Sequence, residues 1–217
     1  MKKVITIDGP SASGKGTLAI LLAKELGWDI LDSGALYRAF AYFSLSEKDG
    51  NIIEENLKNI SFKIIDKKIE VLFKNNDISN HLRNEKTAIL ASKISALSET
   101  REILLPIQRA FSNKNNLIAD GRDMGSIVFP DADLKFFLDA APEIRAKRRY
   151  LELQKRGQEV NIHDLIKDII ERDKKDRMRK LSPLTKTNDS ILLDSSNLTQ
   201  NSMLKEALKN IMERKII

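Results

Sequence analysis

Cysteine is absent from the 217-residue chain, and this absence excludes disulfide bonds, thiolate metal sites and cysteine nucleophiles. Only two histidines are present, His81 and His163, and their wide separation argues against a shared metal site, so we expect both to be structural. No apolar run reaches the roughly 18 residues that a membrane-spanning helix needs. Asp8 and a glycine-rich loop interrupt the first apolar run, so the N-terminus has no signal-peptide pattern. These absences predict a protein of the reducing cytoplasm.

Aromatic residues are also scarce, at 6% of the chain, whereas charged residues are plentiful and leave a net charge of +6. A basic protein binds either nucleic acid or small polyanions that are gathered in one cleft. On a surface that binds nucleic acid, arginines usually alternate with aromatic residues along a stripe. In this chain the arginines of the recognisable motifs instead follow apolar runs. We therefore expect small anionic ligands, with no nucleic acid and no membrane as partner.

Five short apolar runs are typical of buried β-strands, and helical stretches such as Gly16–Leu26 and Pro142–Lys155 separate them. The five runs are Val4–Ile7, Asp29–Leu31, Leu117–Ala119, Leu134–Leu138 and Ile191–Leu193. Alternating strands and helices predict an α/β fold with a five-stranded parallel sheet and helices on both faces. Ligands of such folds bind at the carboxyl ends of the strands, so the residues after each run are the candidates for a site.

One segment departs from this alternation. Ile60–Ser79 alternates apolar and polar residues around two turn sequences, which predicts a small antiparallel β unit inserted into the α/β frame. A helical stretch over about Glu85–Asn113 is then expected to return the chain to the third strand of the sheet.

The stretch GPSASGKGT follows the first predicted strand and precedes the first predicted helix. Small residues allow the backbone N–H groups to form an anion nest, the helix adds its positive N-terminal end, and the lysine reaches the β- and γ-phosphates of a nucleotide. The expected ATP contacts of the loop are Gly9, Pro10, Ser11, Ala12, Ser13, Gly14, Lys15, Gly16 and Thr17. Gly16 stands where most loops of this kind have a hydroxyl that binds magnesium, so the nearest hydroxyl is displaced to Thr17.

The form GKGT resembles the P-loop nucleoside monophosphate kinases, and further motifs narrow the resemblance to the bacterial cytidylate kinase family. These motifs are LDSGALYR at 31–38, ADGRDMGSIVFPDA at 119–132, FFLDA at 136–140, RRYLELQKRG at 148–157 and ERDKKDRMR at 171–179. The resemblance extends from Ile5 to about Ser195, nearly the whole chain, and the order of the motifs makes it specific.

The resemblance implies transfer of the γ-phosphoryl group of ATP to CMP or dCMP, by a monomer, with Mg²⁺ held mostly through water and phosphates. It also implies an organisation into three parts. The core covers about 1–32, 114–147 and 180–217, a nucleoside-monophosphate lobe with the β insert covers about 33–113, and a short helical lid covers about 148–179.

The resemblance further implies a set of residues that contact the acceptor nucleotide. They are Ser33, Tyr37, Arg38, Ser92, Arg101, Arg122, Asp123, Arg172 and Asp176. Asp123 is the expected partner of the cytosine amino group, because an ionised carboxylate only accepts hydrogen bonds and cannot pair with the carbonyl of uracil. Outside their motifs, Asp123 would be interpreted as the cap of a turn or helix, and Arg38 as an exposed helix arginine.

The resemblance implies that five cations neutralise charge during the transfer. They are Lys15, Arg122, Arg148, Arg172 and Arg179, with Arg148 at the start of the lid and also in contact with ATP. The spacing of Arg172, Asp176 and Arg179 would place the three on one helix face, although a solvated face with ion pairs fits the same pattern. Asp8 and Asp120 could each orient the water around magnesium or cap a loop.

Two alternative functions stay open at this point. The first is a kinase with the same chemistry and another acceptor, such as UMP or AMP. The second is a basic P-loop protein that binds nucleic acid without kinase activity, which the placement of the arginines disfavours.

Overall fold

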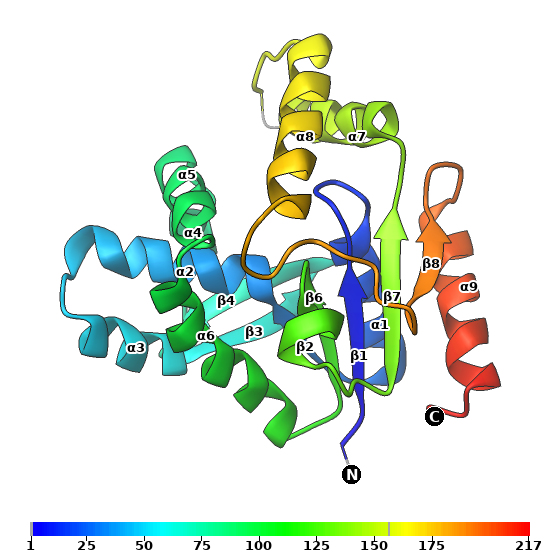
Figure 1. Ribbon diagram of the computed structural model, residues 1–217, viewed down its shortest axis with the longest axis horizontal. Helices are drawn as coiled ribbons and strands as arrows, with labels where there is room; N and C mark the ends of the chain where they lie inside the picture. Colours follow the sequence, from blue (N-terminus) through cyan, green and yellow to red (C-terminus); the bar gives the residue numbers. More distant parts are fainter. Residues whose placement is uncertain (1, 156) are drawn as a thin grey trace.

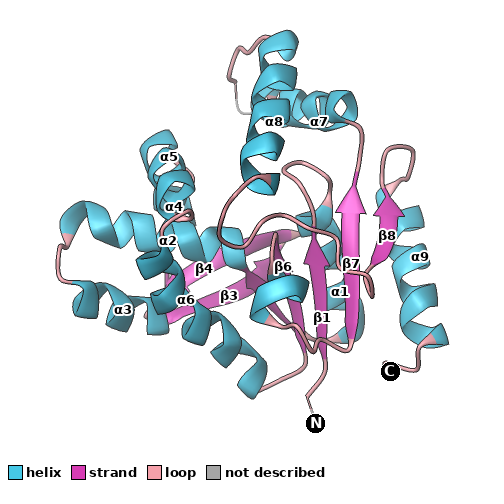
Figure 2. Ribbon diagram, viewed as in Figure 1, coloured by secondary structure: helices cyan, strands magenta, loops and turns pink. Residues whose placement is uncertain are grey.

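The computed structural model describes residues 2–155 and 157–217, with Glu85 described by its backbone only; Arg156, in the predicted lid, lies outside the described residues. Its central feature is a sheet of parallel strands (Figures 1 and 2). The strands are β1 (Val4–Asp8), β2 (Asp29–Asp32), β6 (Leu117–Gly121), β7 (Leu134–Asp139) and β8 (Ile191–Asp194). They lie in the order β2-β6-β1-β7-β8, and every pairing is parallel, which confirms the predicted five-stranded parallel sheet.

Helices cover both faces of this sheet, as predicted. One face carries α1 (Lys15–Leu26) and α9 (Gln200–Glu213), and the other carries α2 (Ser33–Ser46), α6 (Ser98–Ala110) and a π-helical turn, η2 (Met124–Val128). The alternation of side chains along β6 explains the two cores. Ile118 packs into the core under α1 and α9, whereas Leu117 and Ala119 pack into the core under α2 and α6.

The parallel register brings the carboxyl ends of the strands to one edge of the sheet. Asp8 of β1 lies opposite Gly121 of β6, and Asp32 of β2 lies opposite Asp120 of β6. The polar residues that follow the predicted strands therefore meet at this edge, where α/β folds bind their ligands.

The segment between α2 and α6 forms a lobe beside the sheet (Figure 1). It contains α3 (Gly50–Lys58), β3 (Ile60–Ile65), β4 (Lys68–Phe73), β5 (Asn76–Asp77), α4 (Ser79–Leu82) and α5 (Glu85–Ile94). The three strands pair antiparallel in the order β3-β4-β5, as predicted from the alternating pattern. The hairpin between β3 and β4 turns at Asp66 and Lys67, which both have positive φ, as the tight turn of a hairpin requires.

The helical stretch predicted over 85–113 is divided into two helices and a short 3₁₀ turn, η1 (Phe111–Asn113). The chain becomes extended at Leu97, with φ −88° and ψ 135°, and this residue starts α6. Arg101 stabilises the break, because its Nε donates to the carbonyl of Ser95 at 2.8 Å. The helical periodicity on both sides conceals this break in the sequence.

Two packed helices, α7 (Pro142–Gln154) and α8 (Ile162–Arg177), lie beyond the carboxyl edge of the sheet (Figure 1). The expectation that Arg179 lies on the same helix as Arg172 is wrong, because α8 ends at Arg177. The chain turns back there, and the N–H of Leu184 donates to the carbonyl of Asp176 at 2.9 Å. Among the described helices, none is both long and apolar enough to cross a membrane.

Candidate active site

The loop of residues 9–14 connects β1 to α1 at the carboxyl edge of the sheet. Gly9 is required by space, since a Cβ added there would lie 2.0 Å from the carbonyl oxygen of Leu138 in β7. Gly14, with φ 95°, starts α1, and no described side chain caps that end of the helix. The first N–H groups of α1 are thus free of a side-chain acceptor, which makes this end of the helix suitable for a phosphate.

Lys15 and the buried Asp120 lie near each other beside this loop, and the Lys15 ammonium donates to the carbonyl of Pro10 at 3.3 Å. Burial lowers the pKa of the Lys15 ammonium and raises the pKa of the Asp120 carboxyl to about 7, and the attraction between the two groups opposes both shifts. Gly16 leaves room for Asp120, because a Cβ at that position would lie 3.2 Å from Asp120 Oδ2. Oδ1 of Asp120 is buried and has no hydrogen-bond partner within the described part of the chain. The carboxylate therefore lies close to the position where most such loops carry a hydroxyl side chain.

Asp8 caps a loop. Its Oδ1 accepts a hydrogen bond from the N–H of Met124 at 2.8 Å, and its Oδ2 accepts one from the N–H of Gly125 at 2.7 Å. The end of β1 is thereby tied to the loop that carries Arg122 and Asp123. Of the two roles that the sequence left open for Asp8, the structure supports the structural one.

The stability that Asp8 contributes is expected to fall as the pH rises. Burial raises the pKa of this carboxyl from 3.8 to about 7, although the N–H groups of Gly125 and Met124 oppose the shift. Since the unfolded chain ionises first, the contribution is complete in acid and is lost as the pH rises through the folded-state pKa. The change amounts to about 2 kcal/mol between about pH 5 and about pH 8. Melting curves should show the advantage of the wild type over Asp8→Asn shrinking by about 5 °C across this range. An advantage that is constant with pH would contradict the prediction.

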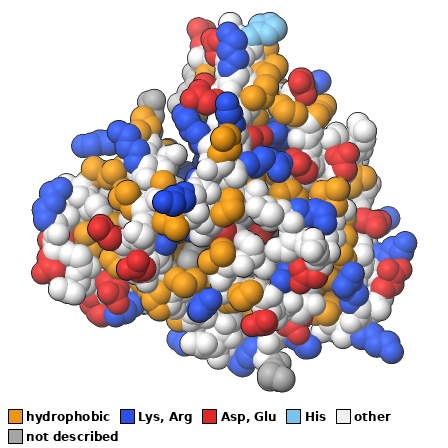
Figure 3. Space-filling model, in the orientation of Figure 1, with side chains coloured by type: hydrophobic (Ala, Val, Ile, Leu, Met, Phe, Trp, Pro, Cys, Tyr) orange, Lys and Arg blue, Asp and Glu red, His pale blue; other side chains and the backbone are white. Residues whose placement is uncertain are grey.

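A cavity of about 470 Å³ opens between α2, α5, α8 and the loop after β6. All nine residues expected to contact the acceptor line it: Ser33, Tyr37, Arg38, Ser92, Arg101, Arg122, Asp123, Arg172 and Asp176. Seven cationic side chains and four carboxylates face this space, so it suits a ligand of net negative charge. Figure 3 shows Lys and Arg side chains gathered on this face, between the α7–α8 pair and the lobe.

One end of the cavity carries a nearly buried ion pair. Nη1 of Arg101 lies 2.7 Å from Oδ2 of Asp123, and the guanidinium also lies 5.7 Å from the centre of the Tyr37 ring. Asp123 is held by this pair, and its Oδ1 has no partner among the described residues. A fixed carboxylate with one free oxygen is suited to accept a hydrogen bond from a ligand.

A second group of arginines in the cavity surrounds Asp176. Arg122 pairs with Asp176, and Nη2 of Arg179 lies 3.6 Å from the same carboxylate. Arg38 and Arg172 make no hydrogen bond or ion pair within the described part of the chain. The pKa of Arg172 is lowered to about 10, first by the loss of hydration in the cavity and second by repulsion from Arg122, whereas attraction to Asp176 raises it. Arg38 and Arg172 thus have no carboxylate partner among the described residues, whereas Arg122 and Arg179 share Asp176.

Arg148, predicted to contact ATP, lies against the phosphate-binding loop. Its Nη1 donates to the carbonyl of Ser13 at 3.1 Å and to Oγ of Ser195 at 3.0 Å, and its Nη2 donates to the carbonyl of Ser195 at 2.5 Å. In this arrangement Arg148 joins α7 to the loop and to the end of β8. Its contact with ATP stays a prediction.

The sequence analysis missed three residues of the site. Gln108 of α6 is buried and its Nε2 donates to Oγ of Ser33 at 2.9 Å. Arg145 and Asp173 form a buried ion pair between α7 and α8. None of the three could be recognised from spacing, because each acts through a partner distant in sequence.

The fold and the site together define a class of enzyme. A phosphate-binding loop with a lysine faces an arginine-rich cavity across the carboxyl edge of a parallel sheet. Two facing anion sites are the arrangement of a P-loop kinase that phosphorylates a small, negatively charged acceptor.

The comparison with known proteins identifies the family within this class. The model of the family described as cytidylate kinase matches residues 5–213. The cytidylate kinase of Photobacterium profundum is 44% identical over 214 residues, which cover 96% of this chain and 94% of that protein. The cytidylate kinase of Vibrio cholerae is 43% identical over 220 residues, which cover 99% of this chain and 97% of that protein. The chain belongs to the cytidylate kinase family.

Similar solved structures agree on the fold. An uncharacterised protein from Eubacterium ventriosum aligns with a TM-score of 0.55 at 12% identity, covering 98% of this chain and 99% of that one. A gluconokinase from Sinorhizobium meliloti aligns with a TM-score of 0.50 at 13% identity, covering 97% and 92%. At this level of identity the likeness concerns the fold alone.

Proposed function

We propose that this chain transfers the γ-phosphoryl group of ATP to CMP or dCMP, giving ADP and CDP or dCDP. Membership of the cytidylate kinase family supports the activity. The observation that carries the assignment to this site is the cavity, which is lined by the Arg101–Asp123 pair and by a group of arginines around Asp176. A cytosine nucleotide combines the two chemistries that these groups can recognise, a base with an amino donor and a phosphate.

ATP is proposed to bind through residues 9–17, with its phosphates on the loop N–H groups and on Lys15. A kinase of this kind works with a divalent metal, and we propose Mg²⁺. The buried, unpartnered Oδ1 of Asp120 beside Gly16 fits a role in holding the hydrated ion, and the hydroxyl of Thr17 is a second candidate. The metal would supply charge neutralisation at the β- and γ-phosphates.

The acceptor is proposed to lie in the cavity with its base at the Asp123 end. Asp123 accepts a hydrogen bond from the cytosine amino group, and Arg101 and Ser92 complete the contacts to the base. Asp176 contacts the sugar, and the phosphate lies at Ser33, Tyr37, Arg38, Arg122 and Arg172. The absence of a carboxylate partner on Arg38 and Arg172 supports their assignment to the phosphate, because an unneutralised guanidinium has its full charge for an anion.

The transfer itself needs no protein nucleophile. An oxygen of the acceptor phosphate forms the new bond to the γ-phosphorus, while the bond from that phosphorus to the β–γ bridging oxygen breaks and ADP leaves. The reactants carry charges of about −4 and about −2, so neutralisation is the main task of the protein. Lys15, Arg122, Arg148, Arg172 and Arg179 are proposed to supply it.

The predicted division of the chain is part of the proposal. The core, the lobe over about 33–113 and the lid over about 148–179 form three parts, and closure of the lid over ATP would exclude water from the transfer. The boundary at 148 falls within α7, whose first residue is Pro142. We propose that the enzyme acts as a monomer in the cytoplasm, and the absence of cysteine agrees with the second part of this proposal.

A substrate panel with Asp123→Ala tests the assignment of the acceptor. The wild type is expected to phosphorylate CMP and dCMP rapidly, and UMP and AMP poorly. In the variant the preference for CMP over UMP should fall about 100-fold, because the amino group of cytosine loses its acceptor. The measurement is kcat/KM for each acceptor from a coupled assay of ADP release.

Asp168→Ala is the matched control, since Asp168 lines the same cavity from α8 but is exposed and makes no contact with the Arg101–Asp123 pair. Its preference for CMP should be unchanged. Equal wild-type rates with CMP and UMP would indicate another acceptor, and salt-sensitive RNA binding without phosphoryl transfer would indicate the nucleic-acid alternative.

A further inference from the structure

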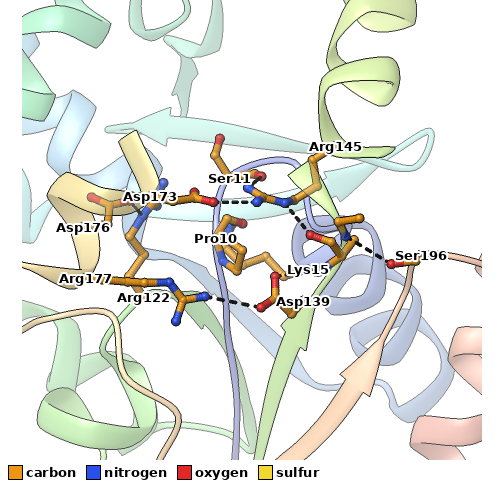
Figure 4. Close-up of polar contacts among 12 residues, drawn as sticks. Pro10, Ser11, Lys15, Arg122, Asp139, Arg145, Asp173, Asp176, Arg177 and Ser196 are labelled. Atoms are coloured by element: carbon orange, nitrogen blue, oxygen red, sulfur yellow. Dashed lines mark hydrogen bonds and ion pairs between the residues drawn. The ribbon is translucent and has the colours of Figure 1, made fainter. Parts of the chain in front are cut away.

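Arg145 of α7 is buried deeply beside the phosphate-binding loop, with only 2% of its surface exposed. Its Nε donates to the carbonyl of Ala140 at 2.7 Å, and its Nη1 donates to the carbonyl of Ser11 at 3.3 Å. Its Nη2 donates to Oδ2 of Asp173 at 2.5 Å. Figure 4 shows the guanidinium lying between Asp173 and the loop at Ser11.

These three acceptors belong to three different parts of the fold. Ala140 follows β7, Ser11 belongs to the phosphate-binding loop, and Asp173 lies on α8. The guanidinium is a planar fork with fixed donor directions, so it sets the relative position of all three segments. A lysine would supply a charge but not this geometry.

Asp173 lies next to Arg172 in the sequence and one helical turn before Asp176 on α8. Arg172 and Asp176 both line the acceptor cavity. Because a helix moves as a rigid unit, docking Asp173 on Arg145 determines where these two neighbours lie relative to the phosphate-binding loop. The pair thereby connects the donor side of the site to the acceptor side.

A contribution to the stability of the fold explains poorly why a buried ion pair is present at this position. Desolvation of two charges consumes much of their attraction, and buried ion pairs often contribute no more than apolar residues of the same shape. Oδ1 of Asp173 adds to the cost, because it is buried without a hydrogen-bond partner in the described part of the chain. A costly pair at the junction of two binding regions is better explained by the geometry that it imposes.

We propose that Arg145 and Asp173 are a positioning pair for phosphoryl transfer: they dock α8 on the phosphate-binding loop so that Arg172 and Asp176 face the acceptor. Neither residue touches the reacting atoms. The inference rests on the proposed function, and it concerns residues that the acceptor and ATP contacts do not include.

The test compares Asp173→Asn, Arg145→Gln and the double variant that carries both changes. Asp173→Asn should lower kcat with CMP at least about tenfold, because small displacements of reacting groups are costly, while KM for ATP stays within about threefold of the wild type. Each single change leaves an unmatched partner and should lower the melting temperature. The double variant removes both charges, so its melting temperature should recover toward the wild-type value while kcat stays at least about tenfold low.

Arg177→Gln is the matched control. Arg177 also joins α8 to the end of β7, through Asp139 at 3.3 Å, but this pair is exposed and lies outside the cavity lining. Its kcat should remain within about twofold of the wild type.

Recovery of kcat together with melting temperature in the double variant would overturn the positioning pair, because a purely structural role predicts it. If a single variant does not fold, the kcat and the melting temperature of the double variant alone distinguish a positioning role from a purely structural one. Inactivity of the wild type with both CMP and dCMP would overturn the proposed function as well, so the two failures are distinguishable.

Discussion

Replacement of Lys15 by methionine is expected to lower kcat about 1,000-fold, which is the largest effect of any single change considered for this site. The lysine is the cation of the phosphate-binding loop, and methionine keeps the length of the side chain but not its charge. The variant should still fold, since burial already disfavours the ammonium and offsets its attraction to Asp120. Single-turnover rates with ATP and CMP, together with melting curves, measure both effects.

Lys24→Met is the control for this change, because Lys24 lies on the same helix but is exposed near its end. Its rate should equal that of the wild type. If Lys15→Met kept more than about a tenth of the wild-type rate, the assignment of Lys15 to charge neutralisation would be wrong.

Arg172→Met is expected to lower kcat/KM for CMP about 100-fold and to leave the melting temperature close to that of the wild type. The catalytic loss follows because Arg172 has no carboxylate partner and its charge is available to the phosphates. The melting temperature should change little because Arg172 is exposed and makes no hydrogen bond or ion pair with a described residue. An enzyme that is equally stable but less active is the result expected for a charge that binds substrate.

Lys174→Met provides the comparison, because Lys174 lies on α8 and is absent from the cavity lining. It should change neither activity nor melting temperature appreciably. A loss of both activity and stability in Arg172→Met would indicate that Arg172 supports the fold and does not bind a phosphate.

Much of the architecture could be predicted because it depends on local patterns. Continuous apolar runs such as Leu134–Leu138 predicted buried parallel strands, and alternation over Ile60–Ser79 predicted the antiparallel insert. The loop after β1 was recognisable because Gly9, Gly14 and Lys15 occur at a spacing that the backbone geometry of an anion site imposes. Features that depend on contacts between distant segments were harder to predict from the sequence. The break between α5 and α6 and the end of α8 at Arg177 are two examples.

The sequence by itself determined which elements form, where the phosphate-binding loop lies and which motif residues are available at the strand ends. Only the tertiary structure decided how the charges are distributed among partners. Asp123 forms an ion pair with Arg101, and Asp176 forms one with Arg122, whereas Arg172 has no ion-pair partner among the described residues. The physical reason is that periodicity and turn chemistry act over a few residues, whereas ion pairing depends on distances between segments that meet only in the folded chain.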